Sequence, residues 1–147
     1  MRNERKLLCL AAQNPPLALA YSATLASTSW HGRNNALLAE SLLDSLEANP
    51  NASAAQLVTN ATQLVPAAGN LLTVDVLDAD ATAEGTMAFL AEELSIGDMA
   101  DTIAALKAQL GTAQPEEEEM LFASISALQH DLSAREVAHA RNAHYHS

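Results

Sequence analysis

Two apolar stripes dominate the second half of the chain. Between residues 82 and 111, apolar side chains recur at spacings of four, three and four residues: Met99, Ile103, Leu106 and Leu110. After Pro115 the same spacing returns with Leu121, Ile125, Leu128 and Leu132. This period matches one face of an α-helix. With Gly111 and Pro115 marking the connection, the pattern predicts an antiparallel helical hairpin packed through these stripes.

The first predicted helix of this pair contains two weak points. Gly85 and Gly97 each disfavour helix by roughly 1 kcal/mol relative to Ala, so a kink near Gly97 is compatible with the pattern. The second helix begins with Glu116–Glu119, whose charges suit the positive end of a helix dipole. After Arg135 the apolar periodicity is lost, and we expect the chain to fray there.

The first 80 residues predict a bundle of about five short helices. The expected helices are 4–13, 16–26, 35–48, one that opens at Ser53, and 66–74, with a loop at 27–34. Asn14-Pro15-Pro16 ends the first helix, because the residue before proline is driven out of the α region. Asn49-Pro50-Asn51 ends the third helix, and Ser53 with Gln56 forms a capping-box pattern. The closing segment is Asp78-Ala79-Asp80.

Composition supports a helical fold. Apolar residues make up 49% of the 147 and aromatic residues only 3%. The apolar residues are mostly Ala and Leu, which favour helix, and their share is too high for a disordered acidic tail. We therefore expect an all-α protein with a globular subdomain at 1–80 and a long helix with a helical hairpin at 81–147.

Charge limits the partners that the chain can take. The formal net charge is −11. Residues 1–38 carry four bases and one acid, residues 39–132 one base and sixteen acids, and residues 133–147 two bases and one acid. Nucleic acids and anionic membranes require clustered Lys and Arg, so we expect direct contact with neither, and a protein partner instead.

Cysteine usage and hydropathy favour the cytoplasm. Cys9 is the single cysteine, so neither an intramolecular disulfide nor a thiolate metal cage can form. A secretory signal is a weaker alternative, because the apolar stretch Leu7–Ala12 is shorter than a signal peptide requires. The sequence also lacks an apolar run of the roughly twenty residues that span a membrane.

The groups that could carry chemistry have simpler explanations. Glu116–Glu119 point in different directions on a helix, and Asp75, Asp78 and Asp80 lack the spacing of a calcium loop. Three histidines near the end, His139, His144 and His146, do not share one helical face. Cys9 is flanked by Leu8 and Leu10 and is expected to be a buried thiol. We expect no catalytic residue, no metal ligand and no cofactor in this chain.

One aromatic residue has two open interpretations. Trp30 lies in a polar segment beside His31 and Arg33. It either fills a gap in the core or serves as an exposed anchor for a partner, where tryptophan is enriched.

Several segments, in order, resemble one protein family. Residues 7–18, Leu-Leu-Cys-Leu-Ala-Ala-Gln-Asn-Pro-Pro-Leu-Ala, resemble the opening of the C-terminal helicase-binding domain of bacterial DNA primase. Residues 49–58 are similar to that family's Pro-Gly-x-Thr-x-x-Gln-Leu-Leu turn, and Asp78–Ala81 stand where it has an acidic pair. Residues 128–135 resemble its closing Leu-x-Gln-Glu-Leu-x-x-Lys. The tryptophan that often precedes the acidic pair is missing, and the tail is longer.

The resemblance implies a non-catalytic adaptor. In the family, a helical bundle and a hairpin bind the hexameric replicative helicase, which couples primer synthesis to unwinding and modulates the helicase. The zinc and magnesium of the parent enzyme, a nucleotidyltransferase, lie outside this domain. Matched by motif, the expected partner contacts are Gln129, His130, Asp131 and Arg135. At His130, where the family commonly has an amide, binding would become sensitive to pH near neutrality.

Two alternatives remain at this stage. The N-terminal domain of the replicative helicase has a similar fold and associates with itself in a ring, whereas the primase domain is expected to be a monomer on its own. A free-standing acidic helical protein, such as an inhibitor or immunity protein, would also explain the acidic middle segment.

Overall fold

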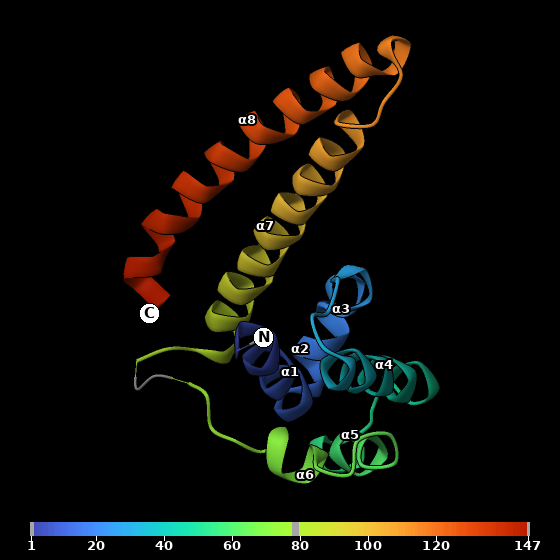
Figure 1. The fold of residues 1–147 in the computed structure, drawn as a ribbon. Coiled ribbons are helices and arrows are strands. Elements are labelled where there is room, and N and C mark those ends of the chain that lie inside the picture. Colours follow the sequence, from blue (N-terminus) through green and yellow to red (C-terminus); the bar gives the residue numbers. More distant parts are fainter. Residues whose placement is uncertain (1, 78–79, 147) are drawn as a thin grey trace. The chain divides into compact units, whose positions relative to one another are not determined.

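The protein is all-α, as the sequence predicts. A computed structural model describes residues 2–77 and 80–146, with side chains for residues 3–77 and 80–141, and its regular elements over those ranges are all helices (Figure 1). They are α1 (Arg2–Gln13), α2 (Pro15–Ala20), α3 (Ser22–Ser27), α4 (Arg33–Ala48), α5 (Ala54–Ala61), α6 (Ala68–Leu71), α7 (Ala83–Leu110) and α8 (Pro115–His146). Asp78 and Ala79, part of the predicted acidic segment, lie outside the described residues.

The chain divides into two compact units, Met1–Ala91 and Glu92–Ser147. We call them unit 1 and unit 2. The division falls later than the predicted boundary between residues 80 and 81, inside α7. The first turns of α7 belong to unit 1, and their side chains Met87 and Leu90 are buried. Apolar spacing alone does not reveal this, because one continuous helix serves both units.

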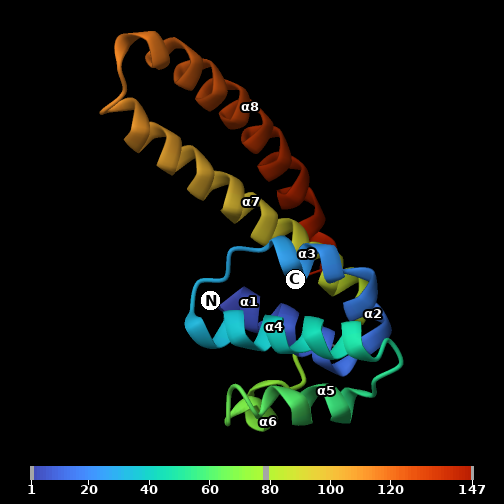
Figure 2. The same ribbon diagram turned by 90° about the vertical axis from the view of Figure 1, so that its right-hand side faces the viewer.

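The core of unit 1 is built around α1. Every side chain from Leu7 to Ala12 is buried, because α1 contacts α2, α4 and α5. Figure 2 shows α4 running alongside α1, with α5 and α6 below α4 in this view. Leu38, Leu42 and Leu46 of α4 supply the facing apolar stripe and are all buried. Their spacing of four residues is the one expected for a helix that buries a single face.

Side-chain hydrogen bonds hold the chain after α6 against α1. The Cys9 Sγ donates to the Leu71 carbonyl at 2.9 Å, and the Gln13 Nε2 donates to the carbonyls of Leu72 and Val74 at 3.0 and 2.7 Å. The predicted helix at 66–74 is wrong in length: α6 covers only Ala68–Leu71. The carbonyls of Leu71, Leu72 and Val74 accept hydrogen bonds from side chains of α1 and not from backbone N–H groups of a longer helix. This explains why α6 ends at Leu71.

The segment predicted as one helix at 16–26 is also divided. Tyr21 separates α2 from α3 with backbone angles of φ −101° and ψ 16°. The backbone ladder nevertheless continues across it, since Tyr21 N donates to Leu17 O and Leu25 N donates to Tyr21 O.

The Ser53 capping box is confirmed: Ser53 Oγ accepts from Gln56 N at 3.2 Å and Gln56 Oε1 accepts from Ser53 N at 2.8 Å.

Unit 2 is a hairpin of two long helices. Figures 1 and 2 both show α8 running antiparallel to the part of α7 that belongs to this unit. Helix α7 continues through Gly97 without a break to Leu110. The expected fraying after Arg135 is wrong, because α8 remains helical to His146.

Candidate partner-binding surface

The two predicted stripes contain the most buried side chains described in unit 2, and we call this pair of stripes the seam. Ile103 and Ile125 are each 5% exposed and are the most buried side chains described in this unit. The other predicted packing residues, Leu106, Leu110, Leu121, Leu128 and Leu132, are half-buried. A seam of one stripe per helix leaves most of each helix surface in solvent. Unit 2 therefore offers a large surface relative to its core.

Arg135 extends this seam with a polar contact. It stands three residues after Leu132, in the register of the stripe, and is half-buried. Its Nε donates to Glu92 Oε1 at 2.9 Å, and its Nη2 lies 2.7 Å from the same oxygen and 2.8 Å from Ser95 Oγ. The sequence assigned Arg135 to partner contact, whereas in the structure its guanidinium joins α8 to α7.

The other three predicted contact residues are exposed but do not face one direction. Gln129, His130 and Asp131 all lie on the surface of α8. Consecutive helical residues are rotated by about 100° from each other, so a flat partner surface cannot contact all three side chains. The structure therefore separates Gln129 from Asp131 across the helix, with His130 between them on the side opposite the seam.

Exposed apolar side chains near the start of α8 were missed by sequence reasoning. Met120 is 76% exposed and Phe122 is 64% exposed. Both flank Leu121 and lie outside the stripe, which is the signal that could have identified them. Phe122 and Gln129 are seven residues apart and so lie on the same face of α8. Protein interfaces are enriched in aromatic residues, so an exposed phenylalanine two helical turns from an exposed amide makes this face of α8 a candidate contact surface.

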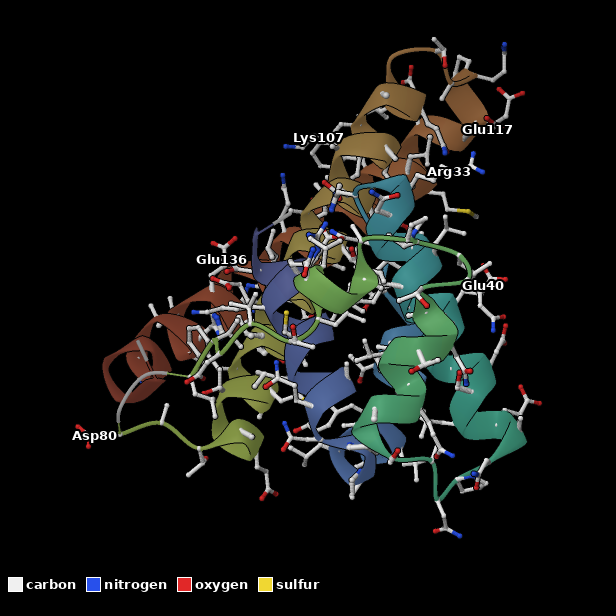
Figure 3. All side chains as sticks on the ribbon, turned by 90° about the horizontal axis from the view of Figure 1, so that it is seen from below. Arg33, Glu40, Asp80, Lys107, Glu117 and Glu136 are labelled. Atoms are coloured by element: carbon white, nitrogen blue, oxygen red, sulfur yellow. The ribbon has the colours of Figure 1, made fainter. Side chains whose placement is uncertain are left out.

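An open groove lies at the turn of the hairpin. It has a volume of about 510 Å³ and is lined by Leu110, Pro115, Glu118, Glu119 and Phe122. Its lining combines the acidic side chains of Glu118 and Glu119 with the apolar side chains of Leu110 and Phe122. Figure 3 shows Lys107 and Glu117 projecting outward on different sides of the hairpin. The end of unit 2 therefore combines apolar contact area with negative charge.

Possible metal ligands do not gather in the described parts of the chain. Over those residues, no group of three or more His, Cys, Asp or Glu side chains is placed to hold a metal ion. His139 is half-buried on α8, and the side chains of His144 and His146 lie outside the described residues. Glu116, Glu117 and Glu118 occupy the first turn of α8, where negative charge favours the helix.

A polar cluster in unit 1 fastens the loop between α3 and α4 to α1. The Glu4 carboxylate is 1% exposed, accepts from His31 N at 2.8 Å and lies 2.7 Å from His31 Nδ1. Asn35 Nδ2 donates to Glu4 at 3.4 Å, and Asn35 Oδ1 accepts from Arg5 Nε at 2.9 Å. Burial acts to raise the pKa of Glu4, but the hydrogen bonds from His31 and Asn35 outweigh it and hold the pKa below its ordinary value.

The neighbouring Trp30 and the thiol of Cys9 have structural roles. Trp30 is half-buried, and its Nε1 donates to the Leu25 carbonyl at 3.3 Å. Burial raises the pKa of the Cys9 thiol, which is the state expected of an unreactive core cysteine. Cys9 is thus buried as the sequence predicts, and neither residue adds chemistry to a site.

Comparison with known protein families, with curated proteins and with solved structures gave no match. Among the described residues, no helix combines the length and the apolar character required to cross a membrane.

Proposed function

We propose that this chain is a helicase-binding domain of a bacterial DNA primase. In this proposal it is a non-catalytic adaptor that brings priming activity to the replicative helicase and modulates unwinding. The identity of the partner rests on the order of the motifs in the sequence. The location of the contact rests on unit 2, where a two-helix hairpin exposes apolar side chains that its own seam does not use.

The motif residues themselves support a likeness in architecture. Gln13 and Asn14, from the Gln-Asn-Pro segment, bond to backbone carbonyls: Gln13 to Leu72 and Val74, Asn14 to Leu10. Ser53 and Gln56 cap α5. These motif residues therefore contribute to the fold of unit 1 in this structure. They leave the partner contact to the exposed residues of unit 2.

The observation that supports the proposed location of the contact is the exposure of Phe122 on the face of α8 where Gln129 also lies. Burying an aromatic side chain on binding releases more free energy than burying most other residues. A neighbouring amide supplies directional hydrogen bonds that fix the register of the partner. Arg135 acts indirectly, because its bonds to Glu92 and Ser95 hold α8 against α7 and thereby position this face.

The direct test is calorimetric titration of the whole chain against the replicative helicase of the same organism at low salt. We expect binding that Phe122→Ala and Gln129→Ala each weaken. The matched control is Leu64→Ala, which removes an apolar side chain that is 46% exposed in unit 1 and should leave affinity unchanged. Absence of binding would refute the proposal.

Size-exclusion chromatography tests the alternative that the chain is the helicase's own N-terminal domain. That domain is expected to associate with itself, whereas a primase domain is expected to elute as a monomer. A concentration-dependent oligomer would favour the alternative.

A further inference from the structure

Unit 1 carries an open groove that the proposed helicase contact does not use. It has a volume of about 520 Å³ and lies between α2 and α3 on one side and the C-terminal half of α4 on the other. Leu19, Ala23 and Ala26 line one wall, and Leu43, Asp44 and Glu47 line the opposite wall. Every one of these residues belongs to unit 1, so the groove exists within a single packed body.

The groove wall formed by α2 and α3 is an apolar strip that no described part of the chain covers. Leu19, Ala23 and Ala26 are spaced by four and three residues, so they share one face although the chain bends at Tyr21. Leu19 is 37% exposed, and Ala23 and Ala26 are exposed as well. Helical spacing of apolar residues normally marks a face that is buried. Here the face is present and a covering element is missing among the described residues.

The edge of the groove is negatively charged. Asp44 and Glu47 are exposed, and within the described residues neither carboxylate forms a hydrogen bond or ion pair. They stand near the C-terminal end of α4, whose last turn has no basic residue. The helix dipole is negative at that end, so carboxylates there are unfavourable to α4 itself and favour a cation placed beside them.

We infer that this groove is a docking site for an amphipathic helix of another protein, with an apolar stripe flanked by Lys or Arg. Two walls with helical spacing suit the insertion of side chains from a third helix. The carboxylates of Asp44 and Glu47 select a cationic partner. A second copy of the chain is poorly suited, because its basic helix α1 buries the apolar residues Leu7–Ala12 in its own core. This surface does not depend on the proposed helicase contact.

Titration of the whole isotope-labelled chain with a synthetic helix-forming peptide, followed by amide chemical shifts, tests the inference. The peptide carries Leu at every third and fourth position and Lys elsewhere. We expect saturable shifts centred on Leu19, Ala23 and Leu43. The double variant Asp44→Lys with Glu47→Lys should weaken binding at least about tenfold. The same peptide with Glu in place of Lys should not bind.

Two further variants separate groove binding from general attraction to an acidic protein. Glu40→Lys reverses one charge on α4, half of the change made by the double variant, at a residue that does not line the groove and whose side chain projects away from α1 in Figure 3. It should leave affinity nearly unchanged. Ala26→Leu fills the groove without altering charge and should weaken peptide binding. This variant keeps the inference testable if the double charge variant does not fold.

Three results would overturn the inference. The first is shifts confined to the acidic start of α8, and the second is equal weakening by Glu40→Lys and the double variant. The third is no saturable shift at about 1 mM peptide. Shifts in the groove that grow with protein concentration alone would assign it to a second copy, which also contradicts a foreign partner.

Discussion

Units 1 and 2 are both helical, but they bury their side chains in different ways. Unit 1 surrounds α1 on several sides, and the side chains of Leu7, Leu38 and Leu42 are completely buried. In the described part of unit 2, the most buried side chains are Ile103 and Ile125, and each is still 5% exposed. The contrast shows how one chain can combine a stable body with an arm whose surface is available for binding. Local stability follows the number of buried apolar contacts, so the arm should open more easily.

The largest expected effect separates the two cores directly. Leu42→Ala removes a fully buried side chain from unit 1 and should cost about 2–5 kcal/mol of unfolding free energy. Leu128→Ala, at a half-buried position of the unit 2 seam, should cost about 1 kcal/mol. Urea unfolding measures both values. Equal losses would mean that the two units are equally well packed, against this account.

The polar cluster of unit 1 gives the next largest effect. Glu4→Gln should lower the free energy of unfolding by about 1–3 kcal/mol, because it replaces hydrogen bonds to a buried charged carboxylate by weaker ones to a neutral amide. Since folding lowers the pKa of Glu4, its contribution is present above the unfolded value near 4.5 and is lost as pH falls through the folded pKa. Unfolding experiments at several pH values should therefore show wild type and variant converging in acid. A difference that persists at low pH would contradict the assignment.

The polar clasp of unit 2, by which we mean the hydrogen bonds of Arg135 to Glu92 and Ser95, should contribute less to the free energy of unfolding. Arg135→Ala removes the bonds to Glu92 and Ser95, which are partly exposed, so a loss of about 1 kcal/mol or less is expected. Amide hydrogen exchange should accelerate in α8 and leave α1 unchanged. Arg141→Ala, an exposed arginine on the same helix, is the control and should have no effect. Faster exchange in α1 would show that the clasp also supports unit 1.

The smallest effect is a gain in stability. Gly97→Ala places a methyl group on α7 where, apart from the adjoining backbone of the helix itself, no atom lies within 4 Å, in a helix that passes through this position without a break. Alanine should stabilise α7 by about 0.5–1 kcal/mol. Slower amide exchange in α7 would report the gain, and a loss of stability would indicate that Gly97 is required as a hinge.

The all-helical fold could be predicted from the sequence, whereas the ends of several helices could not. Apolar spacing predicted one packed face on each helix of the hairpin, and Ile103 and Ile125, which lie on those faces, are the most buried side chains described in unit 2. It failed where polar residues occupy the seam: Arg135 and His139 continue the register of Leu128 and Leu132, and so α8 extends further than an apolar pattern indicates. It also failed at α6, where Cys9 and Gln13 donate hydrogen bonds to the carbonyls of Leu71 and Leu72, which are distant from them in the sequence.

The candidate surface was only partly accessible to the same reasoning. Motif matching selected Gln129, which is exposed, and also Arg135, which the fold uses between α7 and α8. Phe122 was overlooked because it has no place in the apolar stripe. An aromatic residue outside a complete stripe is a signal that can be read from sequence, once the stripe itself has been assigned.

The most direct test of the central claim is a residue-by-residue footprint of helicase binding. The isotope-labelled chain is mixed with the replicative helicase of the same organism, and amide signals are compared before and after. We expect signals around Phe122 and Gln129 in α8 to weaken first, while those of Leu7 and Leu42 in unit 1 persist at lower occupancy. A footprint confined to unit 1, or spectra that do not change at saturating helicase, would contradict it.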